Sequence, residues 1–66
     1  MTVITYANIE KAFLALMAKT QKTTFELYNS ETLEEDISLI LGVTDDMLVS
    51  DETFWAWEND MQKALF

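Results

Sequence analysis

The chain contains no cysteine, no histidine and no proline, and its single glycine is Gly42. Without cysteine, disulfides cannot stabilise the fold and the redox compartment leaves no mark on the sequence. Without histidine, the commonest zinc ligand and the usual general base near neutral pH are both missing. The lack of proline and the single glycine leave no segment with the composition of a linker. We therefore expect one domain with no catalytic residues, no metal and no cofactor.

Long apolar runs are also missing. No stretch approaches the roughly 20 apolar residues of a membrane span. The first residues, MTVITYANIEK, lack the basic-then-apolar pattern of a secretory signal. We expect a soluble, cytoplasmic protein made of one domain over residues 1–66. A domain of this size buries only about 60% of the surface that its unfolded chain exposes, so its stability is marginal.

Basic residues are scarce beyond residue 25. Residues 1–25 hold Glu10 against three lysines, a balance of +2, and residues 26–66 hold eleven acids against Lys63, a balance of −10. A field of this sign repels nucleic acid and anionic membranes and attracts basic protein surfaces. The expected partner is a basic protein, with no direct binding of nucleic acid or membrane.

Apolar residues recur at three- and four-residue steps in three stretches, which predicts helices over residues 6–20, 33–41 and about 51–66. The predicted buried faces are Tyr6, Ile9, Phe13, Leu16 and Met17 in the first helix, Leu33, Ile37, Ile40 and Leu41 in the second, and Phe54, Trp57, Met61, Ala64 and Leu65 in the third. This pattern favours an all-α fold, a small three-helix domain with short connections.

Helix ends are predicted from capping residues. Thr5 suits the N-cap of the first helix and Ser50 that of the third. The second helix opens with a capping box of Thr32 and Glu35, and Gly42 suits the left-handed residue at its end. Thr44 then caps a short turn over residues 45–49.

Residues 21–30 fit two structures. Thr23, Phe25 and Leu27 alternate with polar neighbours, as in a strand. A strand here would pair with residues 2–5 and give an α+β fold with a minor two-stranded hairpin. Thr23 and Glu26 also fit a capping box that opens a short helical turn. We favour the helical turn or an irregular connection, because a bare two-stranded sheet is weak.

The acids have a structural role and a candidate functional one. Glu34, Glu35, Asp45, Asp51 and Glu52 open predicted helices, where the helix dipole favours negative charge. The whole set, with so few lysines to balance it, destabilises a small domain through self-repulsion, which a basic partner would offset. Carboxylates a few ångströms apart resemble a row of phosphates, and arginine pairs with either group.

Trp55 points about 100° away from Phe54 around the third helix, on the edge that also holds Phe66. Two interpretations stay open. Either the first helix or residues 21–30 cover this edge, or Trp55 is an exposed aromatic anchor of the kind enriched at interface hot spots. In the second case the surrounding acids are Asp51, Glu52, Glu58 and Asp60.

The run Leu41–Gly42–Val43–Thr44 resembles the turn of helix-turn-helix domains. Residues 45–52, which would form the recognition helix, contain four acids and no base. Because DNA binding needs lysine and arginine contacts to phosphate, this segment does not bind DNA. It also lacks the glycine and ligand spacing of a calcium loop.

Our leading hypothesis is a non-catalytic acidic protein that docks on a basic, nucleic-acid-binding surface of a partner protein and inhibits it by nucleic-acid mimicry. Small acidic proteins made by phages or other mobile elements against host nucleases and defence systems are often of this type. The predicted contacts are Glu34, Glu35, Asp45, Asp46, Asp51, Glu52, Trp55 and Glu58. The alternative is a structural homo-oligomeric helical module, such as a homodimer, with Trp55, Phe66 and Leu48 buried between copies.

Overall fold

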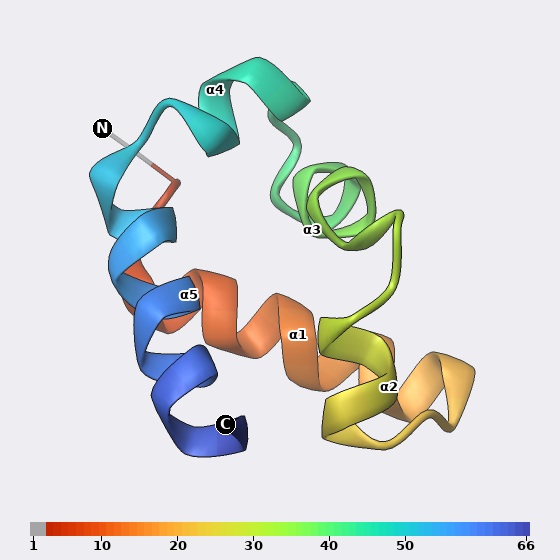
Figure 1. Ribbon diagram of the computed structural model, residues 1–66. Helices are drawn as coiled ribbons and strands as arrows, with labels where there is room; N and C mark the ends of the chain where they lie inside the picture. The colour runs from red at the N-terminus through yellow and green to blue at the C-terminus, as the bar shows by residue number, and fades with distance from the viewer. Residues whose placement is uncertain (1–2) are drawn as a thin grey trace.

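The computed structural model describes residues 3–66, and over them the chain forms helices joined by short connections (Figure 1). The helices are α1 (Tyr6–Thr20), α2 (Thr24–Tyr28), α3 (Leu33–Leu41), α4 (Asp45–Val49) and α5 (Glu52–Leu65). The all-α prediction is confirmed, with α1, α3 and α5 as the three main helices. No strand forms within residues 3–66. The hairpin alternative is therefore not adopted there, and its residue 2 lies outside the described part.

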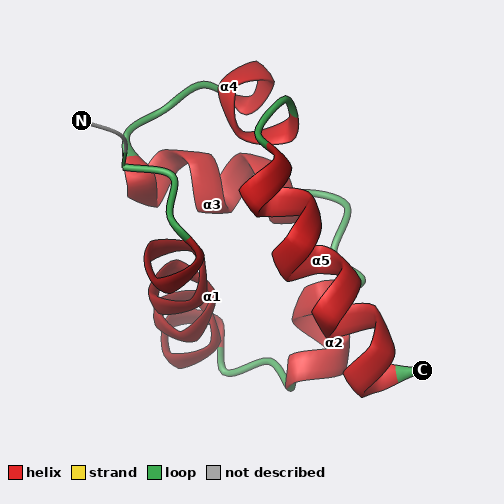
Figure 2. Cartoon of the chain, turned by 90° about the vertical axis from the view of Figure 1, so that its left-hand side faces the viewer, coloured by secondary structure: helices red, strands yellow, loops and turns green. Residues whose placement is uncertain are grey.

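The long helices cross rather than align. α3 is seen end-on in Figure 1, where α1 lies across the view, and the quarter turn to Figure 2 reverses the two. α1 packs against both α3 and α5, while α4 joins α3 to the start of α5. α2 lies beside the end of α5, where the ring centroids of Phe25 and Phe66 are 5.5 Å apart. The molecule measures 31 × 24 × 20 Å.

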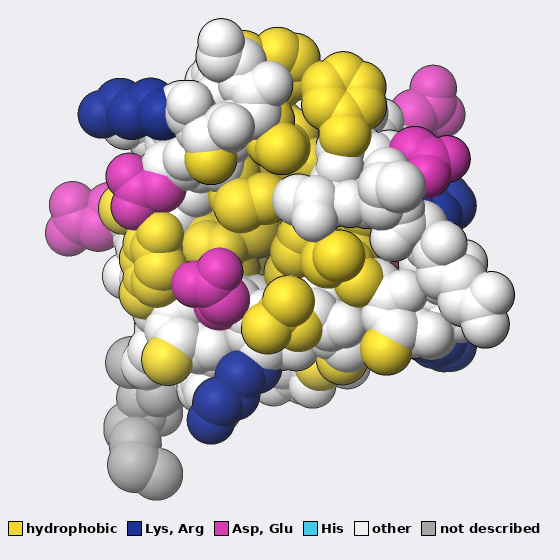
Figure 3. Space-filling model, turned by 90° about the horizontal axis from the view of Figure 1, so that it is seen from below, with side chains coloured by type: hydrophobic (Ala, Val, Ile, Leu, Met, Phe, Trp, Pro, Cys, Tyr) yellow, Lys and Arg dark blue, Asp and Glu magenta, His cyan; other side chains and the backbone are white. Residues whose placement is uncertain are grey.

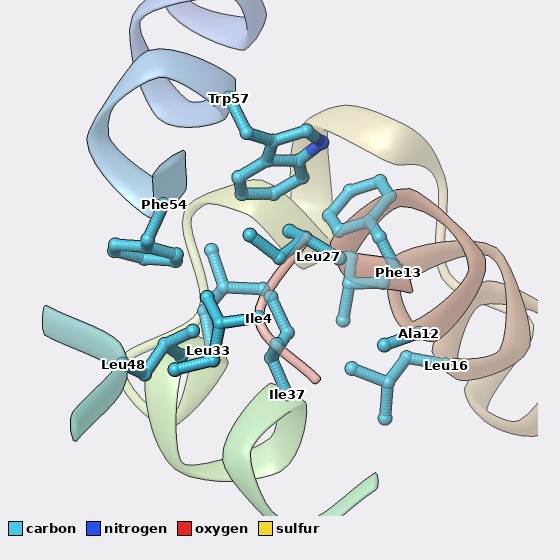
Figure 4. Close-up of a cluster of buried hydrophobic side chains, with 11 residues drawn as sticks. Ile4, Ala12, Phe13, Leu16, Leu27, Leu33, Ile37, Leu48, Phe54 and Trp57 are labelled. Atoms are coloured by element: carbon cyan, nitrogen blue, oxygen red, sulfur yellow. The ribbon is translucent and has the colours of Figure 1, made fainter. Parts of the chain in front are cut away.

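The core fills the space between the five helices (Figure 4). Phe54 and Trp57 of α5 are fully buried, and the Trp57 ring meets that of Phe13 at a centroid distance of 5.3 Å. The short helices α2 and α4 are each anchored by one buried leucine, Leu27 and Leu48. Burying a side chain of this size stabilises a fold by about 1.5–3 kcal/mol. Leu48 therefore belongs to the core of one chain, and the expectation that it lies between copies is wrong.

Most of the predicted helix ends are confirmed. Three threonine hydroxyls accept an amide hydrogen bond three residues on: Thr5 from Asn8 at 3.1 Å, Thr23 from Glu26 at 3.2 Å and Thr44 from Met47 at 3.2 Å. Thr23 and Glu26 complete the capping box that favoured a helix over a strand. Gly42 ends α3 with a φ of 75°, the left-handed conformation that glycine adopts without strain.

Two predicted caps are wrong. Thr32 makes no capping bond, because its φ of −102° and ψ of 16° are not the extended values of an N-cap. Its hydroxyl donates to the Asp36 carboxylate instead, at 3.1 Å. The Ser50 hydroxyl donates to the Met47 carbonyl at 3.2 Å, so Ser50 closes α4. The N-cap of α5 is Asp51, whose carboxylate accepts from the amide of Thr53 at 2.8 Å.

The buried face of α3 is rotated from the predicted one. Leu33 and Ile37 are buried as predicted, but Ile40 is exposed and Ser38 is buried in its place. The reason is that α3 contacts α1 on one side and α4 on the other, so its buried stripe follows those neighbours. At the ends of α1 and α5, where less of the core lies beneath, Tyr6 and Ala64 are also exposed.

Tyr6 joins two helices that are far apart in the sequence. Its hydroxyl donates to the Asp60 carboxylate at 2.7 Å, and this bond raises the pKa of Tyr6. Asp60 therefore faces α1. It lies about 140° around α5 from Trp55 and does not belong to the surroundings of that ring.

The longest helix, α1, has 15 residues. Nowhere in residues 3–66 does a helix combine the length and the apolar character that crossing a membrane requires.

Candidate partner-binding surface

Trp55 lies on the surface where α4 and α5 meet, and 49% of it is exposed. Its indole N–H donates to the carbonyl of Val49, the last residue of α4. Its ring meets Phe54 edge-on at a centroid distance of 5.3 Å. The exposed interpretation of Trp55 is therefore the one the structure adopts. The ring is fixed against α4 on one side and open on the other.

Four of the predicted contact acids lie on the two helices that meet at this ring. Asp45 and Asp46 form the first turn of α4, and Asp51 and Glu52 open α5. A five-residue helix is only about 7 Å long, so the two helix starts are close together. We name the set of Asp45, Asp46, Asp51, Glu52 and Trp55 the acidic corner.

The members of the acidic corner are not equally free. Asp51 is half-buried, and one of its carboxylate oxygens accepts the capping bond from Thr53. Asp45, Asp46 and Glu52 are exposed. The last three therefore carry the charge that a partner can reach, and Asp51 mainly holds the end of α5.

Glu58 lies one turn beyond Trp55 and faces Glu34 of α3. Burial, and secondarily the negative charge of Glu34, raises the pKa of Glu58. Its Oε2 atom is buried and receives no hydrogen bond within residues 3–66. The nearby Tyr28 hydroxyl donates to the main-chain carbonyl of Glu58 at 3.4 Å, so it does not satisfy the carboxylate. This pair extends the acidic surface along α5 but shows less of its charge to solvent.

Glu35, the remaining predicted contact, is exposed on the outward side of α3. One turn further along the same side is Leu39, which is 74% exposed. Glu35 adds negative charge to the surface of α3 but does not belong to the acidic corner.

Sequence reasoning missed three exposed apolar residues on the helices that carry these acids: Leu39, Ile40 and Met47. Leu39 does not share the helix face of Leu33 and Ile37, and this spacing could have predicted that Leu39 is exposed. Ile40 follows Ile37 by three residues and so was assigned to the core. Met47 lies in a helix too short to show a period.

The carboxylates of this surface have no basic side chain as a partner in the described part of the chain. Among residues 3–66, no lysine forms an ion pair with a side-chain carboxylate. The same residues contain no cavity and no group of three acids that could hold a metal ion. What the surface presents is negative charge around one aromatic ring.

No protein-family model matches this chain, and comparisons with curated proteins and with solved structures likewise find no match.

Proposed function

We propose that this protein is a non-catalytic inhibitor that docks its acidic corner on a basic surface of a partner protein. The partner's surface is one that normally binds nucleic acid, and the inhibitor occupies it as a mimic. The source would then be a phage or another mobile element that acts against a host nuclease or defence system.

The observation that carries the proposal is the half-exposed Trp55 held against α4 beside acids that no lysine balances. The bond to the Val49 carbonyl fixes the ring before binding, so little side-chain entropy is lost on docking. Tryptophan is the residue type most enriched among interface hot spots, together with tyrosine and arginine.

Arginine is the side chain that fits this arrangement best. Its guanidinium pairs with a carboxylate in the same two-pronged geometry that it uses for phosphate. It also stacks on aromatic faces, and tryptophan gives the strongest such contact. An arginine-rich surface shaped for a nucleic-acid backbone could therefore pair with Asp45, Asp46 and Glu52 and stack on Trp55.

The charge of the acidic corner should set the rate at which the partner associates. Changing Asp46 and Glu52 to lysine should slow association with the partner by about tenfold or more at low salt, because charge steers the encounter. Asp51 is left unchanged, because its carboxylate caps α5. The control is Glu10→Lys, a charge reversal on α1, which should alter the rate far less. Equal slowing by the control would contradict a role for the acidic corner.

The experiment begins with capture of proteins from a lysate of the source organism on the immobilised protein at low salt. A purified captured protein is then tested for binding to a labelled DNA duplex and a labelled RNA duplex. The expected result is that the inhibitor displaces one of the duplexes from the captured protein and that Trp55→Ala weakens this displacement. The proposal is overturned if the captured protein binds each duplex as well with the inhibitor present as without it.

A further inference from the structure

A second surface lies away from the acidic corner, where α2 meets the end of α5. The ring centroids of Phe25 and Phe66 are 5.5 Å apart, and those of Tyr28 and Phe66 are 6.3 Å apart. Phe25 is 51% exposed and Phe66 is 71% exposed, although both take part in this cluster. We name Phe25, Tyr28 and Phe66 the aromatic cluster.

Apolar surface continues from the aromatic cluster towards α1. Figure 3 views the molecule from the side of α2 and the end of α5 and shows hydrophobic side chains gathered over the middle of this face. Met17 of α1 and Met61 of α5 are partly buried against the core, and the Thr24 hydroxyl contacts the Met17 sulfur at 3.7 Å. Methionine side chains adapt to an irregular partner surface, so this face suits a protein contact.

The charges around this face differ from those elsewhere. Three lysines lie on the segments that border it: Lys19 in the last turn of α1, Lys22 before α2 and Lys63 in the last turn of α5. The pKa of Glu26 is lowered mainly by its hydrogen bonds with Thr23, and to a smaller extent by the charge of nearby Lys22. Figure 3 shows charges of both signs around the apolar centre.

We propose that this face binds a second copy of the same chain in a symmetric dimer. A chain of net charge −8 approaches its own copy with least repulsion where its lysines gather. Across a twofold axis the rim meets itself, and because this rim carries charges of both signs, a register that sets lysines of one copy opposite acids of the other is open to it. A strongly basic partner finds no such match here, because the lysines repel it.

This proposal is independent of the inhibitor function and moves the contact expected between copies from Trp55 to the aromatic cluster. Phe66 is retained as a contact, and Phe25 is added. The apolar area is small for a dimer interface, so the dissociation constant should be on the order of 100 μM. The acidic corner stays free in the dimer to bind its partner.

The test is sedimentation equilibrium of the full chain from about 10 μM to about 1 mM, a range that spans the expected dissociation constant. The double variant Phe25→Ser, Phe66→Ser should weaken dimerisation by about tenfold or more, as loss of a hot spot does. Both rings are more than half exposed, so the variant should keep the helical circular dichroism of the parent. Leu39→Ser is the matched control, because Leu39 is exposed on α3 away from this face.

Dimerisation that is weakened in the double variant and unchanged in Leu39→Ser supports the proposal. A chain that stays monomeric across the whole range overturns it. A dimer that Trp55→Ala disrupts while the double variant leaves it intact also overturns it. Either of these two overturning results would leave the displacement experiment valid, because that experiment depends on the residues of the acidic corner.

Discussion

At the scale of single residues, Glu58 is the side chain whose environment opposes its charge. It is half-buried, it faces Glu34, and its Oε2 atom receives no hydrogen bond within residues 3–66. Because its pKa is raised from the ordinary 4.5, the folded chain binds the proton more tightly than the unfolded chain. Ionised Glu58 therefore lowers the free energy of unfolding above its folded-state pKa, and this cost disappears below pH 4.5.

Glu58→Gln should raise the free energy of unfolding at pH 7 by about 0.5 kcal/mol, the size of a partly exposed charge interaction. The gain should shrink as the pH falls through the folded-state pKa and vanish once Glu58 is protonated in both states. Urea unfolding at several pH values measures it. A gain that is the same at pH 7 and at pH 4 would mean that ionisation is not the cause.

The control for this prediction is a double-mutant cycle with Glu34→Gln. Either single change removes the repulsion between the two carboxylates, so the double variant should gain less than the sum of the two single gains. Strict additivity would show that Glu34 does not act on Glu58 and that burial alone raises the pKa.

At the scale of helices, two positions in the left-handed region close α1 and α3 in the same way. Gln21 has a φ of 58° and its amide bonds to the Met17 carbonyl, and Gly42 has a φ of 75° and its amide bonds to the Ser38 carbonyl. A Cβ at Gly42 would meet no atom within 4 Å, so any substitution there acts through the backbone alone. The two ends differ in which residue adopts the unfavourable φ and in the next amide, which bonds to the Ser38 carbonyl after Gly42 but to the Thr20 hydroxyl after Gln21.

Gly42→Ala should therefore lower the free energy of unfolding by about 1 kcal/mol, the cost of the left-handed conformation for a residue with a Cβ. Gln21→Gly should raise it by about 0.5 kcal/mol, since relief of the strain exceeds the added entropy of the unfolded chain. Urea unfolding of both variants gives the two signs. A stabilising Gly42→Ala would contradict the assignment of this helix end.

Helix ends were predictable where the chain enters the helix in an extended conformation. Thr5, Thr23 and Thr44 have extended backbones, and their predicted capping roles are confirmed. The predictions failed at Thr32 and Ser50, whose backbones are not extended and whose hydroxyls donate to Asp36 and Met47 instead. Local sequence gives both possibilities, and the tertiary path of the chain decides which bond forms.

The candidate site was less predictable than the helices. Helical spacing places Trp55 away from Phe54, but whether another segment covers it depends on where the connections run. The chain puts α2 against Phe66 and only the end of α4 against Trp55, so one edge of α5 splits into two different surfaces. Nothing in the spacing of residues 52–66 encodes that division.

At the scale of the whole molecule, the net charge of −8 opposes folding and favours binding. Unpaired carboxylates repel one another in the folded chain more than in the expanded unfolded chain. Salt weakens this repulsion, since the screening length falls to about 10 Å at 0.1 M. The same screening weakens attraction to a basic partner.

Raising sodium chloride from about 10 mM to about 0.5 M should increase the free energy of unfolding in urea by roughly 1 kcal/mol, because it screens self-repulsion. The control is the Asp46→Lys, Glu52→Lys variant, whose net charge is −4 because each change adds two positive charges to −8. Its stability should depend less on salt. Partner affinity should fall over the same range, so weaker binding in salt cannot be attributed to unfolding.

The two tryptophans of α5 differ in a way that makes the protein its own optical probe. Trp57 is fully buried with no acceptor for its indole N–H within residues 3–66, whereas Trp55 is half-exposed and bonded to a carbonyl. Indole emission shifts to longer wavelength with solvent contact and hydrogen bonding. Trp57 therefore emits at the blue end and reports the integrity of the core, while Trp55 emits at the red end and reports contact at the acidic corner. One emission spectrum separates a partner that docks from a fold that opens.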